Sequence, residues 1–503
     1  MVKSVKKIAK LLTTVTLIAV LMLAGVLNVA TDHVTALPGD EWEIEWNKNF
    51  GGSIWDIFQS VAPALDGGYI AVGYSYSTDG DLDDLNKGNN DAIIVKYDKN
   101  GNVVWNKNYG GSDADTFDCV ASTSDGGYIA VGESWSTDGD LTGLNKGQGD
   151  AIIVKYDKYG EIDWNKNFGG TDGDRFYSIT QTLDGGYVAV GYSRSSTGDL
   201  PGLNKGYIDA VIVKYDEHGD IEWNKNFGGS DGDDFRSVSL SADGGYAAVG
   251  YSNSTDDDLF GLNKGYTDAI IVKYDEHGNV EWNKNFGGSS DETFESIGQT
   301  SDGGYIVSGR SHSTDGDLFD KGDARAIIVK YDEHGDIEWN KSFGGDSDNE
   351  TFLSVTQILD GGYVAVGYSD STDGDLAYTN KGEFDGIIAK YDKHGEMEWN
   401  KNFGGLGWDF LHFVASTPDG GYVTVGTSGS IGGDLAGLNK GEDDAVIVKY
   451  HDTSAPTGGD EGEGGTNVAP PNTGSTAVQV GGSIVGFIVV STVAMLGRRY
   501  RRA

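Results

Sequence analysis

The sequence predicts an all-β fold, a seven-bladed β-propeller of four-stranded blades, and two observations lead to it. First, a unit of about 59 residues is repeated seven times along the 503 residues. The Trp of a W-N-K segment returns at Trp46, Trp105, Trp164, Trp223, Trp282, Trp339 and Trp399. The Asp of a D-G-G-Y segment returns at Asp66, Asp125, Asp184, Asp243, Asp302, Asp360 and Asp419. A period of this length is typical of solenoids, arrays and propellers.

Second, each unit contains four short strands. In the second copy we expect strands over residues 92–97, 103–109, 117–123 and 128–134, each rich in Val, Ile, Tyr, Phe or Trp. Gly, Asp and Asn separate them and favour tight turns. No segment of the repeat has a helical period. A four-stranded sheet repeated around a ring is a propeller blade.

The two ends of the repeat region predict that the ring closes. Residues 43–50 form a lone W-N-K strand, and the last strand, residues 445–450, is not followed by one. The first strand can therefore complete the last blade and leave no open sheet edge.

The motifs D-A-I-I-V-K-Y-D, N-F-G-G-S-x-x-D and D-G-G-Y-I-A-V-G-Y-S recur between residues 43 and 450. In these motifs the chain resembles the bacterial seven-bladed β-propeller repeat family (SBBP-type). The resemblance implies the propeller fold and an exported or surface location. It implies little about activity, because members of that family have no agreed one.

Composition excludes several functions. The chain has 37 Lys and Arg against 78 Asp and Glu, a net charge of -41. Such a surface repels nucleic acid and anionic lipid and attracts cations. Cys119 is the only cysteine, so no intrachain disulfide forms. We expect a monomeric propeller over residues 37–452.

Residues 1–36 are predicted to be a signal peptide. Four lysines precede a mostly apolar stretch over residues 11–29, and Val34, Thr35 and Ala36 supply small residues for cleavage. An uncleaved anchor is the alternative. Residues 453–469 are acidic and Gly-rich, which predicts a flexible linker.

Residues 470–503 contain a second targeting pattern. The sequence Pro-Pro-Asn-Thr-Gly over residues 470–474 precedes an uncharged apolar span, residues 478–496, and four arginines. This order resembles the Gram-positive LPxTG cell-wall sorting signal, with Pro470 where that motif has Leu. The resemblance implies cleavage between Thr473 and Gly474 and attachment of Thr473 to the wall. The alternative is a transmembrane anchor. Both place the propeller outside a bacterial cell.

No catalytic constellation is evident. Four of the eight His lie in D-x-H-G turns, where Asn100 or Tyr159 stands in other copies. The chain has no Cys cluster and no HExxH motif. We therefore do not expect an enzyme.

Two acidic series define a candidate Ca²⁺ site in each blade. One precedes the D-G-G-Y Asp by ten residues: Asp56, Asp115, Asp174, Asp233, Glu292, Glu350 and Asp409. The other follows the D-G-G-Y strand: Asp81, Asp140, Asp199, Asp258, Asp317, Asp375 and Asp434. Carboxylates in Gly-rich loops are oxygen ligands for Ca²⁺. They also form turns by accepting backbone N–H bonds, and this alternative stays open.

Strand direction places both acidic series and the long loops on one face of the ring, where function on a rigid scaffold usually lies. Two positions that we assign to this face differ in every copy. One holds Tyr76, Trp135, Arg194, Asn253, His312, Asp370 and Gly429. The other holds Gln59, Asp118, Tyr177, Arg236, Glu295, Leu353 and His412. Candidate ligand-binding residues are Trp55, Tyr76, Trp135, Tyr177, Arg194, Arg236, His312, Trp408 and His412, because Tyr, Trp and Arg are favoured at contacts. The alternative is that these positions are exposed to solvent and vary because no function constrains them.

These features predict a cell-surface binding or adhesion module whose partner is an extracellular protein or a glycan. One alternative is a glycan-active enzyme that uses carboxylates as acid and base. A second is a structural surface-layer or spacer protein.

Overall fold

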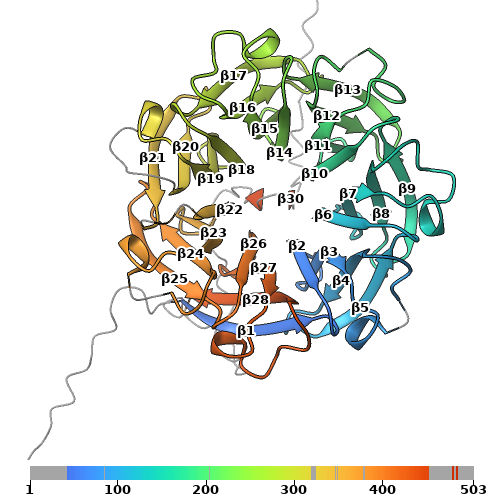
Figure 1. Ribbon diagram of the computed structural model, residues 1–503, viewed down its shortest axis with the longest axis vertical. Helices are drawn as coiled ribbons and strands as arrows, with labels where there is room; N and C mark the ends of the chain where they lie inside the picture. Colours follow the sequence, from blue (N-terminus) through green and yellow to red (C-terminus); the bar gives the residue numbers. More distant parts are fainter. Residues whose placement is uncertain are drawn as a thin grey trace, which may run out of the picture. The chain divides into compact units, whose positions relative to one another are not determined.

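The computed structural model describes residues 42–452 except 84, 203, 319–324, 346, 348 and 378–379, and also residues 479–480 and 483–484. The predicted signal peptide, the linker and the sorting residues Thr473 and Gly474 lie outside the described residues. Seven four-stranded antiparallel sheets are arranged in a ring (Figure 1). The fold prediction is confirmed.

Each of the first six blades is a meander that runs from the ring axis outward. Blades 1 to 3 are β2 (Asp56–Pro63), β3 (Tyr69–Ser75), β4 (Asp91–Tyr97) and β5 (Val103–Tyr109); β6 (Asp115–Ser122), β7 (Tyr128–Ser134), β8 (Asp150–Tyr156) and β9 (Ile162–Phe168); β10 (Asp174–Gln181), β11 (Tyr187–Ser193), β12 (Asp209–Tyr215) and β13 (Ile221–Phe227). Blades 4 to 6 are β14 (Asp233–Leu240), β15 (Tyr246–Ser252), β16 (Asp268–Tyr274) and β17 (Val280–Phe286); β18 (Glu292–Gln299), β19 (Tyr305–Ser311), β20 (Arg325–Tyr331) and β21 (Ile337–Phe343); β22 (Thr351–Gln357), β23 (Tyr363–Ser369), β24 (Asp385–Tyr391) and β25 (Met397–Phe403).

The seventh blade joins the two ends of the repeat region. It contains β26 (Asp409–Ser416), β27 (Tyr422–Ser428) and β28 (Asp444–Asp452), and its outer strand is β1 (Trp42–Phe50). β1 runs antiparallel to β28, with Phe50 opposite Ala445 and Trp42 opposite Asp452. The first strand therefore closes the ring, as the sequence predicts.

Short 3₁₀ helices lie in the long loops between the second and third strands of most blades. They are η1 (Gly80–Leu82), η2 (Gly139–Leu141), η3 (Asp257–Leu259), η4 (Gly316–Leu318), η5 (Gly374–Leu376) and η6 (Gly433–Leu435). Within the described residues no helix is long and apolar enough to cross a membrane. Two further strands, β29 (Gln479–Val480) and β30 (Ser483–Ile484), pair with each other.

Hydrophobic clusters between neighbouring blades form the core. All seven residues of β4 are buried, because this strand packs against both adjacent blades. Phe117 of β6 stacks on Tyr109 of the preceding blade, with ring centroids 5.6 Å apart, and meets Tyr156 edge-on at 6.3 Å. Such ring pairs add about 0.5–1.5 kcal/mol each beyond the area they bury.

The repeated Trp also packs between blades. Trp105 lies 6.1 Å from the ring of Tyr128 in the next blade. Gly160, in the D-x-x-G turn of that blade, has φ +82°, and a Cβ there would lie 2.9 Å from the Trp105 ring. Both the conformation and the close approach require glycine at this turn.

A β-bulge in every inner strand directs one side chain toward the ring axis. In β6 the pairing with β7 shifts between Phe117 and Cys119, so Asp118 has no partner residue. The same shift occurs in the other inner strands. Bulges re-aim side chains in this way next to functional sites.

Candidate binding site in the central channel

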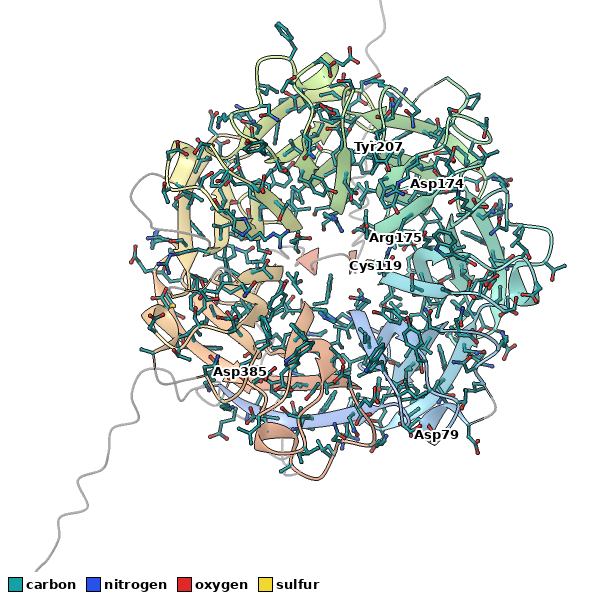
Figure 2. The ribbon with its side chains drawn as sticks, viewed as in Figure 1. Asp79, Cys119, Asp174, Arg175, Tyr207 and Asp385 are labelled. Atoms are coloured by element: carbon teal, nitrogen blue, oxygen red, sulfur yellow. The ribbon has the colours of Figure 1, made fainter. Side chains whose placement is uncertain are left out.

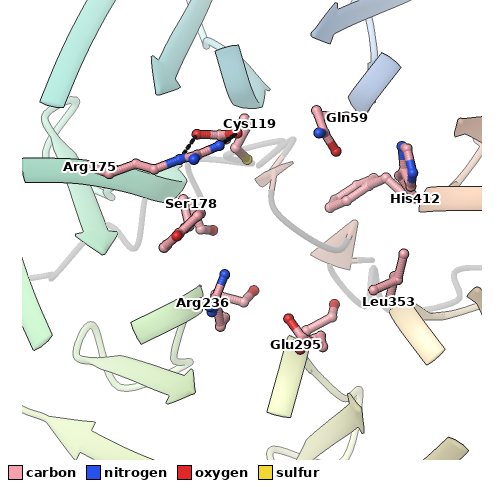
Figure 3. A pocket seen from close by; sticks show the side chains of 13 residues that line it. Gln59, Cys119, Arg175, Ser178, Arg236, Glu295, Leu353 and His412 are labelled. Atoms are coloured by element: carbon pink, nitrogen blue, oxygen red, sulfur yellow. Dashed lines mark hydrogen bonds and ion pairs between the residues drawn. The ribbon is translucent and has the colours of Figure 1, made fainter. Parts of the chain in front are cut away.

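The seven bulged residues line one cavity of about 300 Å³ on the ring axis (Figure 3). They are Gln59, Asp118, Tyr177, Arg236, Glu295, Leu353 and His412. This set is one of the two variable series that the sequence shows. The prediction that it belongs to the long-loop face is wrong in one respect, because the bulge turns these residues into the channel.

Small residues that follow the bulge form part of the channel wall. Ser178, Ser237 and Ser296 line the cavity, and the Ser237 hydroxyl accepts the Ile297 N–H of the next blade at 3.3 Å. Cys119 takes this place in blade 2, where it is 3% exposed. Burial raises the pKa of its thiol. Cys119 is therefore a small, buried wall residue at the place that serine occupies in other blades.

One half of the channel is charged. Arg175 of β10 donates from Nε to Asp118 Oδ2 at 2.8 Å and from Nη2 to Asp118 Oδ1 at 2.6 Å, and its Nη1 lies 3.5 Å from Glu133. Arg175 and Cys119 lie near the axis, whereas Asp79 and Asp385 lie further out (Figure 2). A bidentate pair between two blades fixes the position of both side chains.

A second arginine continues this charged half. The guanidinium of Arg236 lies 4.4 Å from the ring centre of Tyr177 and 5.4 Å from that of Tyr251. Arg175 lies 4.9 Å from the same Tyr177 ring, so that ring is flanked by two cations. Nη2 of Arg236 lies 3.3 Å from Asp234 Oδ2.

Asp234 is 2% exposed. Burial raises its pKa to about 7, and the nearby Glu295 adds to this, although Arg236 opposes it. Two atoms of the pair, Asp234 Oδ1 and Arg236 Nε, are buried and have no hydrogen-bond partner in the described part of the chain. Because an unpaired buried polar atom costs free energy, this pair favours the approach of a further polar group that can hydrogen-bond to it.

The other half of the channel is less polar. Leu353, Phe413, Gln59 and His412 line it. His412 Nδ1 lies 2.9 Å from the carbonyl oxygen of Phe58, which can only accept, so Nδ1 carries the proton. Burial lowers the pKa of His412, so the ring is neutral at pH 7 and its Nε2 is an acceptor.

Aromatic rings connect this half to the long-loop face. The His412 ring stacks on Phe410 at 6.4 Å, Phe410 lies 5.6 Å from Phe384, and Phe384 lies 6.1 Å from Trp408. Trp408 is 52% exposed, and its indole N–H donates to Glu383. In the neighbouring blade Trp55, 48% exposed, lies 5.8 Å from Tyr76.

The other candidate binding residues remain on separate loops. The Trp135 N–H donates to the carbonyl of Ala114 in its own blade, and His312 makes the equivalent bond to Asp291. Arg194 lies 5.6 Å from the ring of Tyr207. The structure thus brings Tyr177, Arg236 and His412 into one cavity. Trp135 and Arg194 approach Glu133 of the charged half, and His312 contacts its own blade.

Sequence reasoning missed three residues of the charged half: Arg175, Glu133 and Asp234. Arg175 and Asp234 occupy the second position of their inner strands, which Ile57 and Thr116 occupy in other blades. This variation between copies is the signal that could have identified them.

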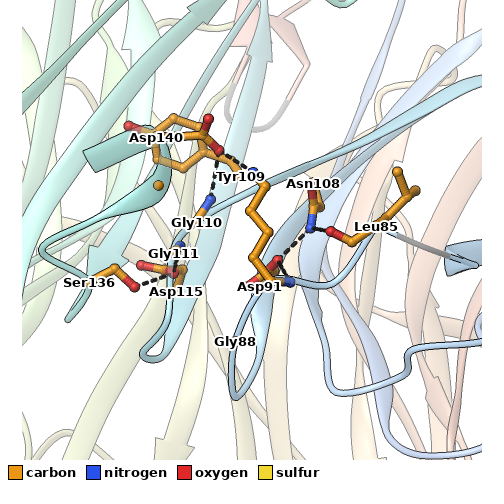
Figure 4. A network of polar contacts seen from close by, with 12 residues as sticks. Leu85, Gly88, Asp91, Asn108, Tyr109, Gly110, Gly111, Asp115, Ser136 and Asp140 are labelled. Carbon is orange, nitrogen blue, oxygen red and sulfur yellow. Dashed lines mark hydrogen bonds and ion pairs between the residues drawn. The ribbon is translucent and has the colours of Figure 1, made fainter. Parts of the chain in front are cut away.

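The first acidic series is held inside a hydrogen-bond network (Figure 4). Asp115 accepts from the Ser134 hydroxyl, from the Ser136 hydroxyl at 2.8 Å and from the Gly111 N–H at 2.8 Å. The same bonds are made by Asp56, Asp174, Asp233 and Asp409.

The second acidic series connects neighbouring blades. Asp140 accepts the Gly110 N–H at 3.1 Å and pairs with Lys87 of the preceding blade. In the part of the chain that the structure describes, no group of three or more His, Cys, Asp or Glu is placed to hold a metal ion. These bonds favour the turn-forming alternative, and calcium binding remains the untested alternative.

Comparisons with known proteins add little to this geometry. No protein-family model matches the chain. The regulatory protein FlaEY of Caulobacter vibrioides is 25% identical over 167 residues, which are 31% of this chain and 17% of that protein. The match thus spans less than a fifth of the relative.

Solved structures with some likeness are also distant. Sqt1 from Chaetomium thermophilum has a TM-score of 0.42 at 13% identity, over 82% of this chain and 99% of that chain. A quinohemoprotein alcohol dehydrogenase from Comamonas testosteroni has 0.38 at 11% identity, over 85% and 79%. The gluconolactonase XC5397 from Xanthomonas campestris has 0.32 at 9% identity, over 79% and 97%. The chain is a seven-bladed β-propeller. Its resemblance to the SBBP-type family rests on the repeat motifs alone.

Proposed function

We propose that this protein is an exported, surface-anchored binding module that takes its ligand in the central channel. One observation carries the proposal: the bulge gives seven blades the same geometry, yet each blade presents a different side chain to one cavity. Framework residues on both sides of the bulge recur, so repetition alone does not explain the difference. A cavity with convergent polar groups is the usual form of a ligand site.

The order of segments in the sequence supports the proposed location. The apparent signal peptide, the linker and the tail with Thr473 and Gly474 stand in the order of a protein displayed on a bacterial cell surface. The partner is then an extracellular protein or a glycan. A cavity of about 300 Å³ takes a small molecule or the end of a larger one.

Binding panels test the proposal. Labelled protein is applied to a glycan array, to extracellular proteins and to a small-molecule library, and each hit is repeated with Arg236→Gln. Lys107→Gln is the matched control, because Lys107 lies on β5 in an exposed ion pair with Glu161. We expect Arg236→Gln to abolish binding and the control to retain it. A hit that is insensitive to Arg236→Gln places the ligand elsewhere, and no hit at all favours the spacer alternative.

A glycan-active enzyme is the second candidate. Asp118 and Glu295 line the cavity as the two carboxylates that such chemistry uses, and burial raises the pKa of the nearby Asp234 to about 7. A hydrolysis screen on the array hits separates the two functions. Release of product that Asp118→Asn or Glu295→Gln abolishes would support the enzyme.

A further inference from the structure

We infer that the channel ligand is a single sugar ring, free or at the end of a glycan, and this inference rests on the proposed binding function. Its hydroxyls would contact the charged half of the channel, and the C–H face of the ring would pack on Leu353 and Phe413. Four observations lead to this chemistry.

The first is the mixture of charges. Two guanidiniums, of Arg175 and Arg236, lie among the carboxylates of Asp118, Glu133 and Asp234. A simple anion would meet these carboxylates, and a simple cation would meet the guanidiniums. A hydroxyl both donates and accepts, so a ligand with several hydroxyls is compatible with both.

The second is the incomplete pair between Arg236 and Asp234. Among the described residues, Arg236 Nε has no acceptor and Asp234 Oδ1 has no donor. The Arg236 side chain is 28% exposed and lines the cavity, so its guanidinium can donate to a ligand hydroxyl. Asp234, whose side chain is 3% exposed, lies beside that guanidinium and helps to position it.

The third is the opposite wall. Leu353 and Phe413 offer apolar surface, while Gln59 and Nε2 of neutral His412 offer hydrogen bonds at its edge. A pyranose ring has the same division, with an apolar face of C–H groups and a polar rim. Aromatic rings then continue from Phe410 to the exposed Trp408, where the next sugar of a glycan could stack.

The fourth is size. About 300 Å³ lies at the lower end of the range for ligand sites. A cavity of this size accommodates one ring, which a free sugar or a terminal residue of a glycan supplies.

Calorimetry and saturation-transfer NMR on the purified full chain test this inference. The probes are glucose, galactose, mannose, N-acetylglucosamine and glucuronic acid, with a glycan array for terminal residues. Glutamate, arginine and citrate are the non-sugar probes. We expect one sugar to bind and its deoxy analogues to bind at least about tenfold more weakly, because each missing hydroxyl leaves a buried polar group unpaired.

Variants assign the binding to the channel. Glu295→Gln and Leu353→Ala should each weaken sugar binding about tenfold or more with an unchanged circular dichroism spectrum. Glu161→Gln, on the outer surface, should bind as the unaltered chain does. If the free sugar binds, the ligand is a free monosaccharide. If binding occurs only on the array, the ligand is the terminal residue of a glycan.

The contrary outcomes are distinct. If only glutamate, arginine or citrate binds, and Glu295→Gln or Leu353→Ala abolishes it, the sugar inference is overturned and the binding function stands. If no probe binds in a way that depends on the channel, the sugar inference is overturned, and the binding function is overturned with it when the panel of extracellular proteins also gives no hit that depends on Arg236.

Discussion

Lys440, in the loop before the last strand, pairs with Asp81 in the first blade. The two residues are 359 positions apart in the chain. The same ion pair joins neighbouring blades elsewhere in the ring, as Lys87–Asp140, Lys146–Asp199, Lys205–Asp258, Lys264–Asp317 and Lys381–Asp434. The junction that closes the ring is therefore built with the contact that joins consecutive blades.

This junction predicts unequal effects for its two partners. Both side chains are about one-third exposed, so the ion pair alone contributes at most about 1 kcal/mol to the free energy of unfolding. Asp81 also accepts the Gly51 N–H at 3.0 Å. Asp81→Ala should therefore cost about 1–2 kcal/mol more than Lys440→Ala in urea denaturation. Asp140→Ala, at an internal junction, is the control and should resemble Asp81→Ala. Equal losses for Asp81→Ala and Lys440→Ala would contradict the prediction.

Removal of β1 should damage the ring much more. Deleting residues 42–50 exposes the edge of β28 and removes Phe50, which stacks on Phe58 at 5.7 Å. It also removes Asn47, whose amide donates to the Asp434 carbonyl at 2.7 Å. An exposed strand edge pairs with other chains. We expect a lower Tm and aggregation by light scattering. Lys48→Ala is the control for a change within β1. A deletion variant that elutes as a monomer and keeps the original Tm would contradict closure through β1.

The fold could be predicted because every blade repeats its signals. Trp105 and Gly160 contact each other between adjacent blades, so their positions recur with the period. The bounds of the strands follow within about two residues. β6 begins at Asp115 and not at Phe117, because Asp115 already pairs with Ser134 of β7. Asp115 is polar and held by hydrogen bonds, so the pattern of apolar residues does not identify it as part of the strand.

The site could be predicted only in part. Variation between copies identified Tyr177, Arg236 and His412, which do line one cavity. Their direction depends on the bulge, a shift of one residue that the alternation of the strand does not reveal. Arg175 and Asp118 are 57 positions apart and meet only because the blades are adjacent. Contacts between neighbouring blades cannot be predicted from a local sequence pattern.

The tail predicts covalent attachment to the wall. If sortase joins Thr473 to the wall, Thr473→Ala or Gly474→Ala should leave the protein in the membrane fraction, held by the apolar span. Ser475→Ala, next to the motif, is the control and should leave wall attachment intact. Cell fractionation with wall-digesting enzymes measures the distribution. Extraction of the unaltered protein by detergent alone, with its C-terminal arginines still present, would establish a membrane anchor.

Calcium dependence separates the two interpretations of the acidic series. Binding to the folded state alone adds about 2.7 kcal/mol per site at a hundredfold excess over Kd. Asp115 and Asp140 already accept backbone, hydroxyl or ammonium donors, which a metal would have to displace. We therefore expect the same Tm in millimolar Ca²⁺ as in NaCl of equal ionic strength. A higher Tm in Ca²⁺, reversed by EDTA, would support the metal alternative.

Two sets of carboxylates predict how stability depends on pH. Burial raises the pKa of Asp56 and of Asp233 to about 6. Asp66 behaves in the opposite way, since the hydrogen bonds of Lys96 and Gly68 outweigh its partial burial and lower its pKa. Between pH 3.8 and about 6, the folded state therefore holds more protons than the unfolded state at Asp56.

The contributions of Asp56 and Asp233 to the free energy of unfolding must then fall as pH rises through this window, because the folded state binds protons more tightly. Above the window these contributions stay low. The contribution of Asp66 is present above pH 3.8 and is lost as pH falls below it. Maximum stability should lie close to pH 3.8, with a Tm that falls from pH 5 to pH 7.5 in buffers of equal ionic strength. Asp56→Asn should reduce this difference. Asp83→Asn, which removes the same charge from an exposed loop position, should leave it unchanged. A Tm that rises from pH 5 to 7.5 would show that the buried carboxylates are ionised without cost.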